Sequence, residues 1–363
     1  MSSPRRTGIA NLPLHGGKAP RWLFERMVPL AREITIAIVS EYGPEEMLRR
    51  MSHPYWFQAF GCVLGFDWHS SGVTTTLCGA LKEGLRGIER DLGLFVAGGK
   101  GKTSRKTPAE IETWGDKISL DPAPLVYASR MSAKVDSAAV QDGYQLYHHT
   151  FLFTSKGKWT VVQQGMNDKN HYARRYHWLG ETVSDFVNEP HSAILSEAAA
   201  STLDLTASES GPSRATIAGI AAQESPEKVI DEMKRLKTLD MPARHLIYVR
   251  DLHPDSLKKI ILSAYEHQPE DFEHLLGLPG VGAKTIRALS LISELVHGVA
   301  PSYRDPARYS FAHGGKDGIP YPVDRQTYDR SIQLLSKAIS RTKIGLSEKQ
   351  KAFQRLDRMR AER

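Results

Sequence analysis

The segment from Tyr144 to Met166 constrains the fold more than any other part of this sequence. Two runs rich in β-branched and aromatic residues flank the short turn from Ser155 to Lys158. This pattern is typical of an antiparallel β-hairpin, because the glycine in the turn permits a tight reversal and the flanking side chains suit pleated strands. The sequence therefore predicts an antiparallel hairpin or small sheet in this part of the chain.

Helical patterns lie on both sides of this hairpin. Before it, helix starts at Pro20 and Pro44 are followed by a leucine repeat from Thr75 to about Glu89. After it, Pro226 marks another helix start, and His253-Pro254 opens a further one. The sequence therefore predicts an α+β fold, with an N-terminal lobe of helices and an antiparallel hairpin or small sheet, and a C-terminal helical lobe.

At about 150 residues per domain, the length of 363 residues favours two domains, with one large or three small domains as alternatives. The stretch 192–223 is rich in Ala, Ser and Thr, which favours a loose connection between domains. We therefore expect an α+β domain at 1–195, a linker at 196–225 and a helical domain at 226–363. The glycine- and lysine-rich stretch 96–108 is expected to be a loop.

The charge balance suits an anionic partner. Lys and Arg number 48 and Asp and Glu number 41, which leaves a net charge of +7. Two cysteines, Cys62 and Cys78, are too few for a disulfide framework and fit a reducing cytoplasm. No apolar run approaches the length of a membrane span, and no apolar segment of a secretory signal follows the N-terminus. Nothing in the sequence predicts an oligomeric state.

The most specific motif is the stretch 270–296, EDFEHLLGLPGVGAKTIRALSLISELV, which resembles the helix-hairpin-helix motif of DNA-repair and recombination proteins. A short helix ends near Leu276, a glycine turn follows, and a second helix begins at Ala283. Glycine lets the backbone approach a phosphate, and the free amides of the second helix bind it without reading bases. The residues expected to contact DNA here are Gly280, Gly282, Lys284, Thr285 and Arg287.

This stretch also resembles the glycosylase/lyase branch of proteins similar to endonuclease III. That resemblance implies Lys284 as the nucleophile that attacks the sugar and Asp324 as its catalytic carboxylate. The sequence departs from the family by a long insertion, 302–321, and by lacking the iron–sulfur cysteines found in many of those enzymes. Lys284 is therefore interpreted first as a lysine that contacts phosphate.

Two further segments carry phosphate-binding or catalytic candidates. Within the insertion, Arg308 and Lys316 are candidates for holding phosphate, and His313 is a candidate catalytic residue. The basic tract KGKTSRK around Lys102 follows Gly99, and the stretch 99–103 ends like a P-loop, but Val96 stands where that motif requires glycine. Lys102 is therefore expected to touch a nucleic-acid backbone from a flexible loop.

The N-terminal part carries a set of histidines, carboxylates and amides near expected element ends. Mixed nitrogen and oxygen ligands suit a divalent metal such as Mg²⁺, Mn²⁺ or Zn²⁺, which would activate water for phosphodiester hydrolysis. The candidate metal ligands are Asp67, His69, Asp136, His148 and His149. The candidate catalytic residues of this part are His15, Lys18, Lys134 and Gln164.

Taken over nearly its full length, the chain resembles a prokaryotic family known only as domain of unknown function 763. The resemblance rests on NLPLHGGKAPRWLFERM, FGCVLGFDWHSSGVTTTLCGALKEGL and YSFAHGGKDGIPYPVDRQTYD. It implies little about function beyond DNA work through the helix-hairpin-helix element.

The leading hypothesis is a cytoplasmic, metal-dependent nuclease that hydrolyses DNA phosphodiester bonds in repair or recombination, with RNA as an alternative ligand. The first domain would carry the chemistry and the helical domain would hold DNA. Two alternatives stay open: a DNA glycosylase with AP-lyase activity that uses Lys284 and Asp324, and a DNA-binding scaffold without enzymatic activity.

Overall fold

The computed structural model describes residues 19–66, 71–169, 171–196, 202–236, 253–307, 325–343 and 345–361. Among the helices of these ranges, none combines the length and the apolar character that crossing a membrane requires.

A five-stranded antiparallel sheet forms the centre of the molecule, in the order β1-β3-β4-β5-β6. Its strands are β1 (Leu94–Lys100), β3 (Gln145–Thr154), β4 (Trp159–Asn167), β5 (Tyr172–Leu179) and β6 (Ala193–Leu195). β3 and β4 form the predicted hairpin, with Thr150 opposite Val162. A second sheet pairs β2 (Val140–Gln141) with β7 (Leu203–Asp204). The predicted α+β class is confirmed.

One face of the large sheet is covered by the N-terminal helices. These are α1 (Arg21–Tyr42), α2 (Pro44–Ser52), α3 (Pro54–Leu64), α4 (Gly72–Leu85) and the short α5 (Glu89–Leu92). Alternate side chains of a strand face opposite sides of the sheet, so Leu152 and Val162 enter this core while their strand neighbours do not.

The opposite face is covered by α6 (Thr107–Ile118) and α7 (Ala123–Lys134), which is followed by a π-helical turn, η2 (Val135–Ala139). Phe151, Phe153 and Trp178 of the sheet pack into this second core. The same core continues into α8 (Gly211–Gln223), α9 (Pro226–Leu236), α11 (Pro254–His267), α12 (Phe272–Gly277) and α13 (Ala283–Leu295). The helical lobe is therefore joined to the sheet by continuous apolar packing.

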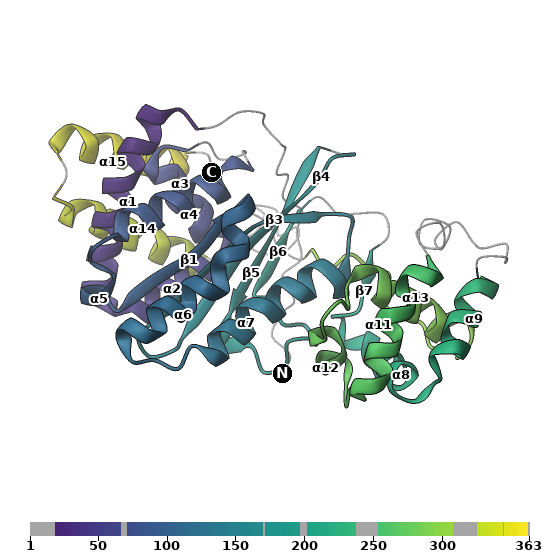
Figure 1. Ribbon diagram of the computed structural model, residues 1–363. Helices are drawn as coiled ribbons and strands as arrows, with labels where there is room; N and C mark the ends of the chain where they lie inside the picture. Colours follow the sequence, from purple (N-terminus) through teal and green to yellow (C-terminus); the bar gives the residue numbers. More distant parts are fainter. Residues whose placement is uncertain are drawn as a thin grey trace.

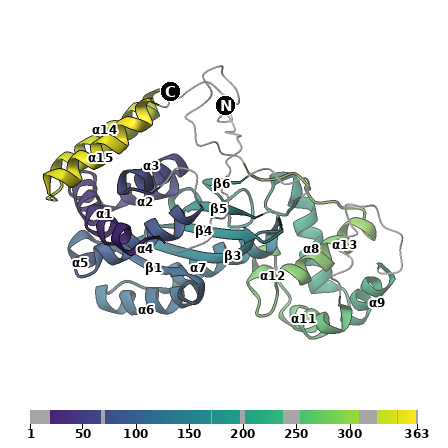
Figure 2. The same cartoon turned by 90° about the horizontal axis from the view of Figure 1, so that it is seen from above.

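Figures 1 and 2 place this helical lobe at one end of the molecule and the last two helices at the other end. Those helices are α14 (Arg325–Arg341) and α15 (Leu346–Ala361), which pack against α1 and α3 respectively. The C-terminal helices thus belong spatially to the N-terminal lobe. The predicted helical domain at 226–363 therefore needs correction, because its last two helices bury their apolar face far from its first ones.

Two other expectations also need correction. The expected linker contains β7, the 3₁₀ turn η4 (Ser208–Ser210) and α8, because alanine favours helix and the small side chains of α8 pack closely against α13. The expected loop at 96–108 forms β1, the 3₁₀ helix η1 (Gly101–Lys106) and the start of α6. Glycine at position 98 is therefore compatible with a strand and does not mark a loop. Its φ is +85°, and a Cβ there would lie 2.3 Å from the carbonyl oxygen of His149, so the strand requires glycine at this position.

Candidate functional site

The turn between α12 and α13 has the shape that the sequence predicts. Gly280 lies in the left-handed region at φ +82°, which favours glycine, and Val281 is buried beneath the turn. Gly282 has an extended backbone at φ −152°, and a Cβ built on it would meet nothing within 4 Å. Gly280 is therefore needed for the reversal, whereas Gly282 leaves open space at the start of α13.

The start of α13 lacks a side-chain cap among the described residues. By contrast, α12 is capped by Asp271, whose carboxylate accepts a hydrogen bond of 2.7 Å from the amide of His274. The first amides of a helix have no partner within the helix and carry its positive dipole end. The uncapped start of α13, beside the open space at Gly282, is therefore suited to an anion.

The inner side of the same turn is held by two side chains of the lobe interface, Lys134 and Gln141. Lys134, the last residue of α7, donates a hydrogen bond to the carbonyl of Val281. Gln141 donates to the carbonyl of Ala283 at 2.9 Å and accepts from Arg287 Nε at 2.7 Å. Burial lowers the pKa of Lys134. These bonds engage carbonyl oxygens, so they leave the amides at the start of α13 available.

The residues expected to bind DNA differ in their exposure and in their position relative to this turn. Lys284 is exposed on the first turn of α13, whereas the side chain of Thr285 is buried. Arg287 is directed partly toward Gln141, as described above. Lys102 is exposed on η1, which is helical and not the expected flexible loop. Arg308 and Lys316 lie outside the described residues, as does Asp324.

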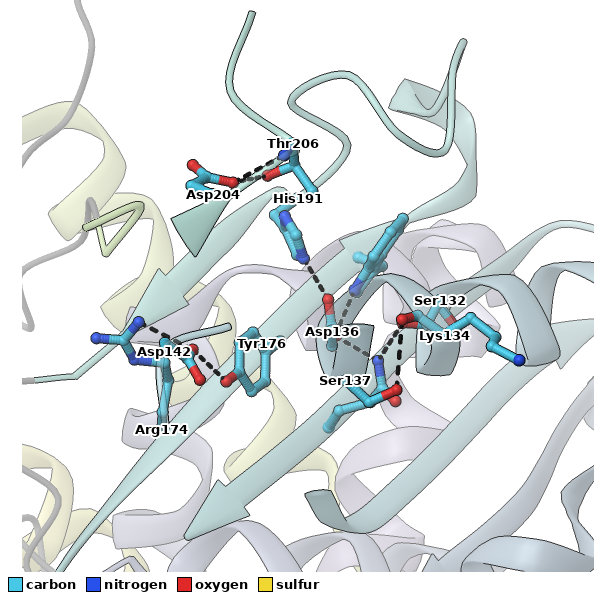
Figure 3. A network of polar contacts seen from close by, with 12 residues as sticks. Ser132, Lys134, Asp136, Ser137, Asp142, Arg174, Tyr176, His191, Asp204 and Thr206 are labelled. Carbon is cyan, nitrogen blue, oxygen red and sulfur yellow. Dashed lines mark hydrogen bonds and ion pairs between the residues drawn. The ribbon is translucent and has the colours of Figure 1, made fainter. Parts of the chain in front are cut away.

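A polar cluster lies between α7, η2 and the sheet (Figure 3). Asp136 is fully buried, and its Oδ1 accepts a hydrogen bond of 2.5 Å from Nε2 of His191. Its Oδ2 accepts from Nε2 of Gln163 at 2.5 Å and from Nε1 of Trp178 at 3.0 Å. Burial raises the pKa of Asp136, and the hydrogen bonds from His191 and Trp178 oppose this rise.

The cluster continues from Gln163 into α7 through His149. Nδ1 of His149 donates to Oε1 of Gln163 at 2.8 Å, and Nε2 lies 2.9 Å from Oγ of Ser129. Both ring nitrogens are therefore engaged, and burial lowers the pKa of His149 to about 4. His149 is a neutral internal link between α7 and the sheet.

His148 and Gln164 lie on the other face of the sheet, beneath α4. His148 is hydrogen-bonded to Thr150 at 2.9 Å, and burial lowers its pKa to about 3. Gln164 donates to the carbonyl of Ser71 at 3.0 Å and accepts a short hydrogen bond from Thr74. Neither side chain can reach the cluster around Asp136, because the sheet lies between them.

The expected metal site is therefore not assembled by its described members. Asp136 and His149 share one face with their polar atoms occupied, whereas His148 faces the other side. In the described part of the chain, no three His, Cys, Asp or Glu side chains are grouped to hold a metal ion. The remaining predicted ligands and catalytic residues, Asp67, His69, His15, Lys18 and His313, lie outside the described residues.

A second buried network lies beside the first and anchors the segment after α13. Arg174 pairs with Asp142 at 2.9 Å and with Asp305 at 2.7 Å, and the guanidinium is fully buried. Tyr176 also donates to Asp142, at 2.6 Å. These bonds connect β5 to Asp142, which precedes it in the sequence, and to Asp305, which follows it. They therefore restrict the movement of β5 beside the cluster around Asp136.

Sequence reasoning missed His191 as a partner of Asp136. The two residues are 55 positions apart, and His191 lies in the short stretch NEPHSA before β6, which carries no motif. The only local signal is a histidine beside Pro190 in an otherwise unremarked connection. Their pairing depends on η2 and β6 meeting over the same strand, which a single sequence does not reveal.

Comparison with known proteins identifies one matching protein family. The family model described as protein of unknown function (DUF763) matches residues 8–323. No curated protein and no solved structure matches the chain.

Proposed function

The chain belongs to the DUF763 family, which assigns no activity, and we propose from the geometry that the protein binds and processes DNA, holding its backbone at the 278–284 turn. The observation that carries this proposal is the orientation of the turn. Lys134 and Gln141 hold its carbonyl oxygens from the inside, while the uncapped amides of α13 stay available beside open space at Gly282. This arrangement suits a phosphate group.

The surrounding charge supports an extended anionic ligand. Lys284 is exposed beside the amides, and Ile260 of α11 lies next to Gly280, since a Cβ built on Gly280 would be 3.4 Å from its Cγ1. The two residues before Ile260, Lys258 and Lys259, are also exposed. Several lysines around one phosphate site favour a polyanion over a single small anion.

The chemistry proposed for this protein is cleavage of the DNA backbone. The described residues do not assemble the expected metal site, so this proposal assigns no metal ligands. Lyase chemistry at Lys284 has less support, because a lysine nucleophile is activated by burial or by a neighbouring charge, and Lys284 is exposed.

Fluorescence anisotropy of a labelled duplex tests DNA binding, with the affinity measured over a range of salt concentrations. For Lys284→Ala, we expect weaker binding and a salt slope reduced by about 1, because one phosphate contact is lost. Lys156→Ala is the matched control, since Lys156 is exposed in the β3–β4 turn. Absence of binding at low salt, or equal weakening by both variants, would refute the proposal.

A cleavage assay then separates the three functional classes. Single-stranded, duplex and abasic DNA are incubated with Mg²⁺, Mn²⁺, Zn²⁺ or EDTA. We expect cutting of intact DNA and no borohydride-trapped adduct at Lys284. An EDTA-resistant adduct confined to abasic DNA would establish the lyase, and binding without cutting would establish a scaffold.

A further inference from the structure

We propose that His191 and Asp136 form a proton-transfer pair, in which Nδ1 of His191 acts as general base toward a phosphodiester. This inference rests on the proposed function for its substrate class, the DNA backbone. It assigns a role to a histidine that the sequence motifs do not mark. Asp136 lies on η2, two residues after Lys134, which contacts the 278–284 turn, and His191 reaches it from the stretch before β6. Figure 3 shows His191, Asp136 and Lys134 in one view.

The first step of the argument is the fixed tautomer of His191. Its Nε2 donates to Oδ1 of Asp136 at 2.5 Å, so the proton of a neutral ring resides on Nε2. Gln163 and Trp178 hold the other carboxylate oxygen, which prevents the carboxylate from turning away. A carboxylate held in this way orients the imidazole and stabilises the imidazolium that forms when the ring takes up a proton.

The second step is the state of the other ring nitrogen. Nδ1 of His191 has no hydrogen-bond partner among the described residues. It is also absent from the set of described polar atoms that are both buried and without a partner. The side chain is 6% exposed, and because Nδ1 is not one of the buried polar atoms without a partner, we infer that it reaches solvent at the edge of the cluster. With the proton on Nε2, Nδ1 presents a lone pair that can accept a proton.

The third step is the contrast with the buried histidines of the sheet. Both nitrogens of His149 are bonded internally, as are both nitrogens of His177, which contacts Arg175 and the carbonyl of Met51. Nδ1 of His148 has no hydrogen-bond partner in the described part of the chain but is buried away from solvent. Of these four histidines, His191 alone combines a buried carboxylate on one nitrogen with access to solvent on the other.

The proposed reaction is hydrolysis. Nδ1 of His191 removes a proton from water while the water oxygen forms a bond to phosphorus. The ester P–O bond breaks, and its electron pair stays on the leaving oxygen, which takes a proton from solvent. The imidazolium then returns its proton to solvent, so the enzyme regains its starting state. Positioned bases of this kind contribute roughly 10²–10⁴-fold to a rate.

The experiment uses the full chain and a chromogenic diester, thymidine 5′-(p-nitrophenyl) phosphate, assayed with Mg²⁺ and with EDTA. We expect His191→Asn to lower hydrolysis at least about 100-fold, with DNA affinity unchanged. The matched control is His297→Asn, because His297 pairs with Glu224 at 3.2 Å on an exposed part of the helical lobe. Absence of hydrolysis by the wild type, or full activity of His191→Asn, would overturn the inference.

Asp136 is a positioning residue, and its test needs a spectroscopic readout. In ¹⁵N spectra of the ring-labelled wild type, we expect His191 as the Nε2-protonated tautomer, and Asp136→Asn should remove that preference. If Asp136→Asn does not fold, carbethoxylation of the wild type by diethyl pyrocarbonate still tests whether Nδ1 of His191 is accessible. We expect His191 to react while His149 does not, and an unreactive His191 would refute an accessible Nδ1.

The same assays separate this inference from the proposed function. Each protein is assayed for DNA binding and for hydrolysis of the chromogenic diester, and Lys156→Ala, which lies outside both proposed sites, should change neither. Hydrolysis that depends on His191 in a protein that does not bind DNA would support the proton-transfer pair and refute the DNA proposal. DNA binding without any hydrolysis would support the DNA-binding half and refute the pair.

Discussion

Lys134 donates a hydrogen bond to the carbonyl oxygen of Val281, and this bond connects the last turn of α7 to the 278–284 turn. The sequence suggested Lys134 as a catalytic residue, but its ammonium group is engaged with the backbone of the other lobe. Lys134 therefore acts on the proposed DNA site by holding the turn in place from its inner side.

For Lys134→Met, we expect weaker DNA binding without a change in the salt slope. A hydrogen bond contributes about 1 kcal/mol, which corresponds to roughly fivefold in affinity when it preorganises a binding site. Lys134 faces a carbonyl and not a phosphate, so its loss should release no additional counterion. Anisotropy titrations at several salt concentrations measure both quantities. A reduced slope like that of Lys284→Ala would instead make Lys134 a direct phosphate contact.

The two glycines of the turn should respond differently to substitution. Gly280→Ala should lower the free energy of unfolding by about 1–2 kcal/mol, because Gly280 has φ +82° and a side chain is strained there. Gly282→Ser should keep or raise stability, by up to about 1 kcal/mol, because serine caps helix starts well.

The same Gly282→Ser variant should bind DNA less tightly. Its side chain would fill the open space at the start of α13, and its hydroxyl would occupy amides that the phosphate needs. Urea unfolding and anisotropy, run on one preparation, test both effects. Unchanged DNA affinity in a stabilised Gly282→Ser protein would show that the amides of α13 do not bind phosphate.

The predicted strand position of two candidate metal ligands is itself incompatible with a shared metal site. His148 and His149 are adjacent, and adjacent residues of a strand face opposite sides of the sheet. Placing both on the β3 hairpin was right, and that placement excludes a shared metal ion with ordinary strand geometry. The pairing of Asp136 with His191 had no comparable local signal, because it depends on tertiary packing over β5.

Composition is a poor guide to secondary structure where small residues have a packing role. Gly98 and its neighbours suggested a loop, but Gly98 lies in β1 because His149 and Thr107 approach too closely for a side chain. The alanine-rich stretch suggested a linker, but α8 uses small residues to pack against α13. The hairpin and the α12–α13 turn were predictable because periodicity and glycine positions determine them locally.

His149 should make the protein less stable in mild acid. Its pKa is about 4 in the folded state and near 6.5 when unfolded, so between these values the unfolded chain binds a proton that the native chain does not. The free energy of unfolding therefore falls as the pH falls from 7 to 5, and His149 accounts for about 2 kcal/mol of the decrease.

Comparison of the wild type with His149→Gln isolates this contribution, because the other titrating groups are common to both proteins. Urea unfolding at pH 7 and at pH 5 gives the two free-energy differences. We expect a smaller decrease for His149→Gln. Equal decreases in both proteins would mean that His149 is protonated in the native state.

Arg174 should be the most costly single charge to remove from the sheet. Its buried guanidinium pairs with Asp142 and Asp305, whose side chains are only 1% and 8% exposed. Arg174→Met would leave both carboxylates buried without their cation, which costs about 3–5 kcal/mol. Arg304→Met is the control, because Arg304 is 86% exposed and lies 3.7 Å from Glu209. Its loss should cost less than about 1 kcal/mol. Thermal and urea unfolding of the two variants measure the contrast, and similar costs would show that the Arg174 network is not buried in solution.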